Sequence, residues 1–280
     1  MLLKCLTRGC VSRHVSVSGS TGRSVLNPVC VNEGGAGSLI RLPVTPTLEQ
    51  ETILAGDAAT ALAAWQARSG EIFTVVDPEN LHYRVRITSG GPDRFCCIPF
   101  ARLAEATESS LRIDVLHALP SKERFELVLE KLTELGVFRV VPMETAHSST
   151  LAERDAHQRK SHRWPHLLRR AGRQCRRAML PELYAPVDFA TALTLVAEAE
   201  VKLLLDETEA PWTLKEGIGQ LRPQSVALLI GPEGGFSRQE VALAQQAGVL
   251  PVRLGPRILR TETAAIAATT LVQGLIGDLG

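Results

Sequence analysis

The chain has 280 residues, which is long enough for one large domain or two smaller ones, each with a hydrophobic core. Hydrophobic residues make up 45% of the chain and charged residues 22%, and no apolar run reaches the length that a membrane span requires. The formal net charge is +1, so the composition excludes a uniformly basic nucleic-acid-binding protein, and any basic surface must be local.

Cysteine spacing gives no sign of a metal site or a disulfide framework. The six cysteines form no C-x-x-C pair, and no histidine stands at zinc spacing from any of them. We therefore expect reduced thiols and no bound metal, as is usual for a protein of the cytoplasm.

The first 38 residues differ in composition from the rest of the chain. They are rich in Ser, Val, Gly and Arg, and no acidic residue precedes Glu33. Organelle transit peptides are basic, Ser-rich and poor in acids, so a targeting segment is one interpretation. Because no amphipathic helix is evident, we favour the other: a disordered leader, read from an early start codon, on a cytoplasmic protein.

Residues 39–106 predict a small β-rich domain. Strands are expected at 39–43, 71–76, 82–87 and 95–98, with turn residues between them. Alternation in the third of these strands places His82, Arg84 and Arg86 on one face. Such a stripe suits phosphate binding, and a solvated strand face explains it equally well.

From residue 107 onward, expected strands and helices alternate, which predicts an α/β domain with a mostly parallel sheet. Strands are expected at 111–119, 138–142, 201–205, 226–230 and 250–254. Helices are expected at 124–135, 156–179 and 189–197, after Ser237, and from Arg260 to about Ile276. Residues 212–219 are expected to cover the sheet edge. The helix after Ser237 has the clearest start, because Glu240 completes a capping box.

The stretch 156–179 is the most basic part of the chain. Its cations are Arg159, Lys160, Arg163, Arg169, Arg170, Arg173, Arg176 and Arg177. Apolar residues recur at spacings of three and four, which indicates a helix with one face in the core, and Trp164 belongs to that face. Charge runs are often solvated helix faces. Because this stretch contains no acidic residue, we favour an anionic partner.

Two loops at the ends of neighbouring strands predict a ligand site. The first, residues 231–235, reads GPEGG, and alone it is equally well explained as a glycine-rich turn. The second crowds two arginines, a glutamate and two threonines into residues 257–263. Ligands of open α/β sheets bind at the carboxyl ends of adjacent strands, so the two loops together favour a binding site.

Both loops match the sequence of a known family. IGPEGGFS at 230–237, followed by LGPRILRTETA at 254–264, resembles the 16S ribosomal RNA uracil-N3 methyltransferase family of the SPOUT superfamily. The resemblance extends over roughly residues 39–280. It includes the K-x-x-E-L-G-V segment at 131–137 and the Q-x-x-R-x-x-x-P pattern at 174–181.

The resemblance implies a fold, a cofactor and a reaction. The fold is α/β, with a small PUA-like RNA-binding β-barrel at 39–106 and a SPOUT domain at 107–280 that contains a C-terminal trefoil knot. S-adenosylmethionine would bind in the knot and methylate N3 of one uridine in small-subunit ribosomal RNA. Relatives usually act as homodimers. A partner chain or the knot would pack on small and apolar residues of the last helix: Ala264, Ala265, Ala268, Leu271 and Leu275.

The resemblance also implies roles for individual residues. The cofactor would contact Leu205, Ile230, Gly231, Gly235, Leu254, Gly255, Ile258, Leu259, Thr263 and Ala264. The RNA would contact Arg68, Arg84, Arg86, Arg163, Arg170, Arg177 and Arg257. In catalysis Arg260 would stabilise the uridine anion or hold the RNA phosphate, and either Glu233 or Glu262 would accept the proton of N3. Glu262 is equally well explained as an acid that stabilises the first turn of a helix.

The chain departs from the family pattern at three places that concern RNA. Residues 61–67 lack the usual His and Arg residues, His147 stands in place of an arginine, and Arg173 in place of a glutamate. His147 is also a conceivable general base. Two alternatives therefore stay open: methylation of another RNA site or atom, such as a ribose 2′-hydroxyl, and a non-catalytic RNA-binding assembly factor.

Overall fold

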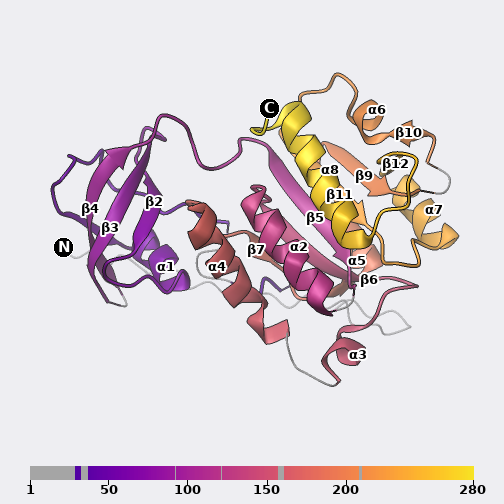
Figure 1. The fold of residues 1–280 in the computed structure, drawn as a ribbon, viewed down its shortest axis with the longest axis horizontal. Helices are drawn as coiled ribbons and strands as arrows, with labels where there is room; N and C mark the ends of the chain where they lie inside the picture. The colour runs from indigo at the N-terminus through magenta and orange to yellow at the C-terminus, as the bar shows by residue number, and fades with distance from the viewer. Residues whose placement is uncertain (1–28, 33–36, 92, 121, 157–160, 208–209) are drawn as a thin grey trace, which may run out of the picture.

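The computed structural model describes residues 29–32, 37–91, 93–120, 122–156, 161–207 and 210–280. Figure 1 shows an N-terminal antiparallel sheet beside a larger α/β part, with helix α4 (Trp164–Cys175) next to the boundary between them. Within the described ranges, no helix is long and apolar enough to cross a membrane.

The N-terminal part is an antiparallel sheet in the strand order β1-β4-β3-β2. Its elements are β1 (Thr52–Ala55), α1 (Asp57–Ala64), β2 (Ile72–Val76), β3 (His82–Gly90) and β4 (Arg94–Arg102). Trp65 is fully buried in its core and meets Phe73 edge-on, with 5.7 Å between the ring centroids. The expected strands at 71–76, 82–87 and 95–98 are confirmed with shifted ends. The expected strand at 39–43 is wrong, because a single bridge between Arg41 and Val76 stands in its place.

The larger part contains a parallel sheet in the order β10-β12-β9-β11-β5-β6-β7, with β8 also paired to β6. Its strands are β5 (Arg112–Ala118), β6 (Arg139–Glu144), β7 (Glu182–Leu183), β8 (Val187–Asp188), β9 (Val201–Leu205), β10 (Trp212–Thr213), β11 (Ser225–Ile230) and β12 (Leu250–Arg253). The five strands expected here are confirmed, each end within about two residues. Residues 212–219 lie at the sheet edge as expected, where they add strand β10 and helix α6 (Leu214–Ile218).

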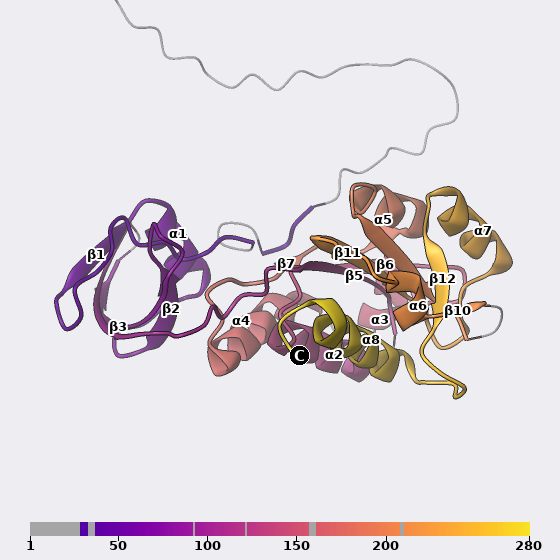
Figure 2. The ribbon, with the colours of Figure 1, turned by 90° about the horizontal axis from the view of Figure 1, so that it is seen from above.

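Helices cover both faces of the parallel sheet (Figure 2). Helices α2 (Lys122–Glu134), α4 and α8 (Thr261–Ile276) lie on one face, and α5 (Phe189–Leu195) and α7 (Arg238–Gln246) lie on the other. Val226 and Leu228 of β11 pack in the core that contains α2 and α8. Ala227 and Leu229 pack in the core that contains α5 and α7. An unbroken apolar strand is thus buried on both faces, as predicted.

The helices α7 and α4 begin with different signals: a side-chain cap starts α7, and a proline in the first turn starts α4. The predicted capping box of α7 is confirmed: Glu240 N donates to Ser237 Oγ at 3.3 Å, and Ser237 N donates to Glu240 Oε2 at 2.8 Å. The basic helix is shorter than predicted, because α4 begins at Trp164 with a proline in its first turn. Residues 157–160 of the predicted helix lie outside the described part of the chain.

The predicted disordered leader, residues 1–38, includes residues that the structure orders. Val31 N donates to the carbonyl oxygen of Leu183 at 2.7 Å, which attaches residues 29–32 to the edge strand β7. The Asn32 side chain adds bonds of 2.8 Å to Pro181 O and from Leu183 N. Backbone pairing at a sheet edge therefore fixes the end of this segment. Residues 1–28 and 33–36 lie outside the described residues.

The small and apolar residues of α8 were expected to receive either a partner chain or the knot. Ala265 and Ala268 are fully buried within the chain, because residues three or four apart on α8 face its own sheet. Leu271 lies outside that core and is 45% exposed. Packing by a partner chain stays a prediction.

Candidate active site

A pocket of about 210 Å³ lies where the sequence predicted a ligand site, between residues 230–235 and 258–261. It opens at the carboxyl ends of β9 and β11, the usual ligand position in an open α/β sheet. Seven predicted cofactor residues line it: Leu205, Ile230, Gly231, Gly235, Ile258, Leu259 and Ala264. Leu254 and Gly255 line a smaller adjoining pocket. Thr263 lines neither pocket and is exposed, so its predicted cofactor contact finds no support.

Glycine backbone makes part of this cradle accessible. Gly235 has φ +68° and Gly255 has φ +153°, conformations that residues with a Cβ rarely adopt. A Cβ built at either position would meet no atom within 4 Å, so open space lies beside the backbone. An apolar pocket with exposed peptide groups fits a flat, hydrogen-bonding cofactor such as S-adenosylmethionine.

A buried network beneath the pocket joins the two loops. Thr261 Oγ1, at the start of α8, donates to the carbonyl oxygen of Gly231 at 2.6 Å. Thr261 Oγ1 also lies 3.4 Å from Nε2 of His117, whose Nδ1 lies 2.6 Å from the Ala118 carbonyl oxygen. Complete burial lowers the pKa of His117 to about 4, so its ring is neutral near pH 7. Its Nδ1 then carries the proton, since a carbonyl only accepts.

Charged side chains from three elements meet beside the pocket. Arg124 of α2 contacts Glu233 Oε1 at 2.5 Å, and its Nε lies 3.9 Å from Glu262 Oε1. Glu233 and Arg260 line the pocket and are exposed, as the prediction required. Glu262 does not line it; its side chain is 12% exposed. Neither Arg124 nor the Thr261 network was predicted from the sequence. Arg124 lies 109 residues from Glu233 and Thr261 lies 144 residues from His117, so no local pattern joins them. Thr261 and Gly231 are nearer, 30 residues apart.

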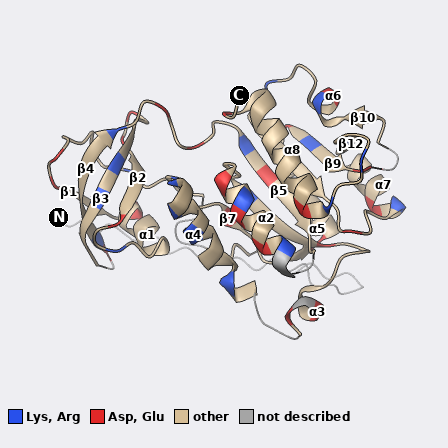
Figure 3. Cartoon of the chain, in the orientation of Figure 1, with Lys and Arg blue, Asp and Glu red and all other residues tan. Residues whose placement is uncertain are grey.

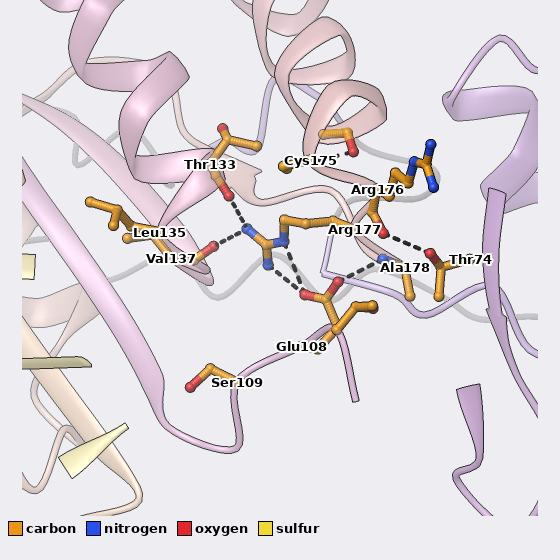
Figure 4. A network of polar contacts seen from close by, with 12 residues as sticks. Thr74, Glu108, Ser109, Thr133, Leu135, Val137, Cys175, Arg176, Arg177 and Ala178 are labelled. Atoms are coloured by element: carbon orange, nitrogen blue, oxygen red, sulfur yellow. Dashed lines mark hydrogen bonds and ion pairs between the residues drawn. The ribbon is translucent and has the colours of Figure 1, made fainter. Parts of the chain in front are cut away.

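The predicted RNA contact of Arg177 is wrong, because its side chain is 4% exposed. Figure 4 shows its guanidinium directed toward Glu108 and Val137. Its guanidinium donates to Glu108 Oε2 at 2.7 and 3.0 Å, and to the carbonyl oxygens of Val137 and Thr133 at 2.8 and 3.2 Å. The other carboxylate oxygen of Glu108 accepts a bond of 2.6 Å from Ala178 N. Arg177 therefore holds the end of α2 to the segment that connects the two parts of the molecule.

Other cations of the basic stretch also have acidic partners, which corrects the expectation that they face none. Arg170 pairs with Glu130 at 3.0 Å, and Arg173 pairs with Glu71 at 3.2 Å. Arg173 also donates to the carbonyl oxygen of Gln66 at 2.9 Å, which binds α4 to the N-terminal part. These acids come from other elements, so the composition of the stretch could not reveal them.

The predicted stripe on β3 is only partly a free surface. His82 is 7% exposed, and its Nδ1 lies 3.2 Å from both N and Oγ1 of Thr107. Arg84 is half-buried and donates to the Arg176 carbonyl oxygen at 2.9 Å, so it serves the contact between the two parts. Arg86 is exposed.

Figure 3 shows that Lys and Arg residues occur along the ribbon of both parts of the molecule. The exposed arginines among the predicted RNA contacts are Arg68, Arg86, Arg163, Arg170 and Arg257. His147 is exposed, and its Nδ1 lies 3.1 Å from the carbonyl oxygen of Gly235. That contact places His147 against the first loop of the pocket. Trp164 packs in the core, 4.7 Å from Phe125 between ring centroids, as predicted.

Known proteins share both the sequence and the fold of this chain. Residues 107–273 match the RNA methyltransferase domain family. The chain is 34% identical over 172 residues to ribosomal RNA small subunit methyltransferase E of Buchnera aphidicola, an overlap of 61% of this chain and 69% of that protein. A putative methyltransferase of Legionella pneumophila, solved with bound S-adenosylmethionine, is 32% identical, with a TM-score of 0.61 over 86% of this chain and 99% of that one.

A second solved structure is similar to the same extent. Ribosomal RNA small subunit methyltransferase E of Neisseria gonorrhoeae, bound to S-adenosylmethionine, is 27% identical and has a TM-score of 0.62. It overlaps 86% of this chain and 98% of its own. The family match, the identities and the shared fold together show that this chain belongs to the RNA methyltransferase domain family and has its SPOUT fold.

Proposed function

We propose that this chain transfers a methyl group from S-adenosylmethionine to N3 of one uridine in small-subunit ribosomal RNA. The pocket between the two loops carries the proposal, because it combines an apolar lining with open glycine backbone at the strand ends. The names of the relatives support the substrate, and the two relatives solved with S-adenosylmethionine support the cofactor.

Residues that line the pockets would hold the cofactor. Leu205, Ile230 and Leu259 offer apolar contacts, and the backbone at Gly235 and Gly255 offers hydrogen-bonding groups. Bound S-adenosylmethionine supplies a methyl group on a cationic sulfur, and the protein must align the uridine with it. We include in the proposal the trefoil knot that the resemblance implies for these loops.

Residues beside the pocket would prepare the uridine. N3 becomes a good nucleophile only after it loses its proton, so the site needs an acceptor and a cation that stabilises the anion. Arg260 is the proposed cation, since it lines the pocket and is exposed. Glu233 and Glu262 are the candidate acceptors.

The exposed cations on both parts of the molecule would bind the RNA backbone. Arg86 and Arg163 are exposed and have no acidic partner among the described ion pairs, which suits contacts with phosphate. We further propose a homodimer in the cytoplasm, which the family resemblance supports.

Nucleoside mass spectrometry of ribosomal RNA tests the reaction. A strain without the gene should lack 3-methyluridine in small-subunit RNA, and the full-length gene should restore it. A Gly235→Val variant, whose side chain occupies the pocket, should not. If 3-methyluridine persists while another methylated nucleoside disappears, the chain modifies a different site or atom.

Calorimetry with S-adenosylmethionine tests the alternative of a non-catalytic assembly factor. The folded wild-type protein should bind the cofactor, and Gly235→Val should bind it much more weakly. Absence of binding by folded wild-type protein would contradict the enzymatic proposal.

A further inference from the structure

Beside the pocket, one cation lies between two carboxylates. Arg124 comes from α2, Glu233 from the loop after β11, and Glu262 from the first turn of α8. The guanidinium reaches both acids, at 2.5 Å from Glu233 and 3.9 Å from Glu262. One positive charge can fully neutralise only one of them, so this group of three carries a net negative charge.

The two carboxylates differ in access and in pairing. Glu233 lines the pocket, and its side chain is 46% exposed, so a bound base can reach it. Glu262 is 12% exposed, and its Oε2 finds no hydrogen-bond partner among the described residues. Glu233, the more exposed carboxylate, therefore has the close ion pair with Arg124, whereas the less exposed Glu262 lies farther from it. A buried charge without a partner is costly, so Glu262 attracts Arg124.

We propose, on the basis of the proposed function, that Glu233 accepts the N3 proton of the uridine and that Arg124 then moves from Glu233 to Glu262. Arg124 acts as a positioning residue: it holds the Glu233 carboxylate in place before the transfer, and it departs once Glu233 has taken the proton. Glu262 provides the second partner, so that the guanidinium is paired in both states.

The transfer balances without a further reactant. The N3–H bond breaks, its proton forms an O–H bond with Glu233, and the electron pair remains on N3. N3 then bonds to the methyl carbon while the carbon–sulfur bond breaks. The electron pair of that bond goes to the sulfur, which becomes neutral. Glu233 finally releases the proton to water, which restores its ion pair with Arg124.

Other charged groups face this cluster. Arg260 and Glu207 line the same pocket, and His147 contacts the Gly235 carbonyl oxygen. His117 of β5 is buried and neutral near pH 7. Among the described residues, Arg124 is the cation within 4 Å of Glu233. Arg124 is therefore the group through which Glu262 can act on Glu233, since it contacts both carboxylates.

Single-turnover methyl transfer by the full chain across pH 4–8, a range that spans the ordinary pKa of a glutamate, tests the proposal, with small-subunit RNA from the deletion strain as substrate. Glu233→Gln should lower the rate about 100-fold or more, the size of a general-base contribution. Arg124→Gln should move the acidic limb of the pH–rate profile to higher pH, and Glu262→Gln should move it to lower pH, each by about one unit. The two opposite shifts would be difficult to obtain from a purely structural role.

Several controls separate this effect from folding and from RNA affinity. Lys131→Gln is the matched control, because Lys131 lies on the same helix, is 36% exposed against 35% for Arg124, and pairs with Glu134 at 2.9 Å. It should leave the profile unchanged. Calorimetry should give the same Kd for S-adenosylmethionine, within about twofold, for all variants. Arg124→Lys keeps the charge and should retain most of the wild-type profile, which guards against misfolding of Arg124→Gln.

Distinct results overturn the inference. Wild-type rates for Glu233→Gln would remove Glu233 as the acceptor, and shifts of the same sign for the two partner variants would exclude the exchange. If Arg124→Gln changes only the RNA concentration dependence, Arg124 is a phosphate contact instead. Wild-type protein that forms no 3-methyluridine would contradict the proposed function itself, whereas active wild type with active Glu233→Gln contradicts this inference alone.

Discussion

Two arginine–glutamate pairs of this molecule have similar lengths and different surroundings. Arg124 and Glu233 meet at 2.5 Å beside the pocket, where their side chains are 35% and 46% exposed. Arg177 and Glu108 meet at 2.7 Å between the two parts of the chain, where they are 4% and 10% exposed. The buried pair has backbone partners on nearly every side, and the exposed pair has a second carboxylate within reach. Burial and surplus partners, more than distance, decide which pair can rearrange.

The largest effect is expected at the pair between the two parts of the chain, Arg177 and Glu108. Arg177→Met leaves Glu108 and two carbonyl oxygens buried without their donor, which should lower the free energy of unfolding by about 3–5 kcal/mol. Arg170→Gln breaks a pair of 3.0 Å in which Arg170 is 62% exposed, and it should cost less than about 1 kcal/mol. Urea unfolding followed by circular dichroism measures both. A stable Arg177→Met protein with weakened RNA binding would restore the original prediction for Arg177.

The next effect concerns the histidine beneath the pocket. In the folded chain the pKa of His117 is about 4 because of burial, below the ordinary 6.5, so the unfolded chain takes up the proton first on acidification. This contribution to stability is present above pH 6.5 and is lost as the pH falls towards 4. It amounts to roughly 3 kcal/mol.

Unfolding at pH 7.0 and pH 4.5 compares the wild type with His117→Gln. The variant should lose less stability between the two pH values, by an amount approaching that figure. Equal losses in both proteins would mean that His117 is not responsible. The result shows whether buried His117 contributes as much to the free energy of unfolding as the Arg177–Glu108 pair does.

The smallest effect should be confined to the cofactor pocket. Gly235→Ala places a methyl group in the open space of the cradle and should raise the Kd for S-adenosylmethionine about tenfold, or 1.4 kcal/mol. Gly219→Ala is the matched control, because its φ of +61° is close to the +68° of Gly235 and it lines no part of this pocket. Both should lose about 1 kcal/mol of stability. Equal affinities in calorimetry would contradict the assignment of the pocket.

Much of the fold could be predicted because its signals are local. The capping box of α7 joins residues three apart, and an unbroken apolar run such as that of β11 is typical of a strand covered on both faces. The pocket followed from a rule of topology: parallel strands bring their carboxyl ends to one edge, which places residues 231–235 and 255–260 at the same edge. The strands β11 and β12 that precede these loops were expected to be neighbours, but β9 lies between them. Five strands of the parallel sheet were predicted from their apolar runs.

The RNA surface was predicted less well, because periodicity identifies a polar face without identifying what lies against it. Eight cations without a nearby acid in sequence suggested a free basic surface, yet Glu71, Glu108 and Glu130 pair with three of them. Alternation on β3 likewise placed His82 on the same face as Arg84 and Arg86, although His82 is buried and contacts Thr107. Arg86 and Arg163 fit the prediction of exposure.

By itself the sequence determined the α/β class, the position of the pocket and most of its lining, since these depend on residue patterns within single elements and on the rules of parallel sheets. Only the tertiary structure decided which charges are neutralised. Arg177 and Glu108 are 69 residues apart, Arg124 and Glu233 are 109 apart, and His117 and Thr261 are 144 apart. An ion pair or a buried hydrogen bond forms wherever packing brings complementary groups together, so spacing along the chain does not reveal it.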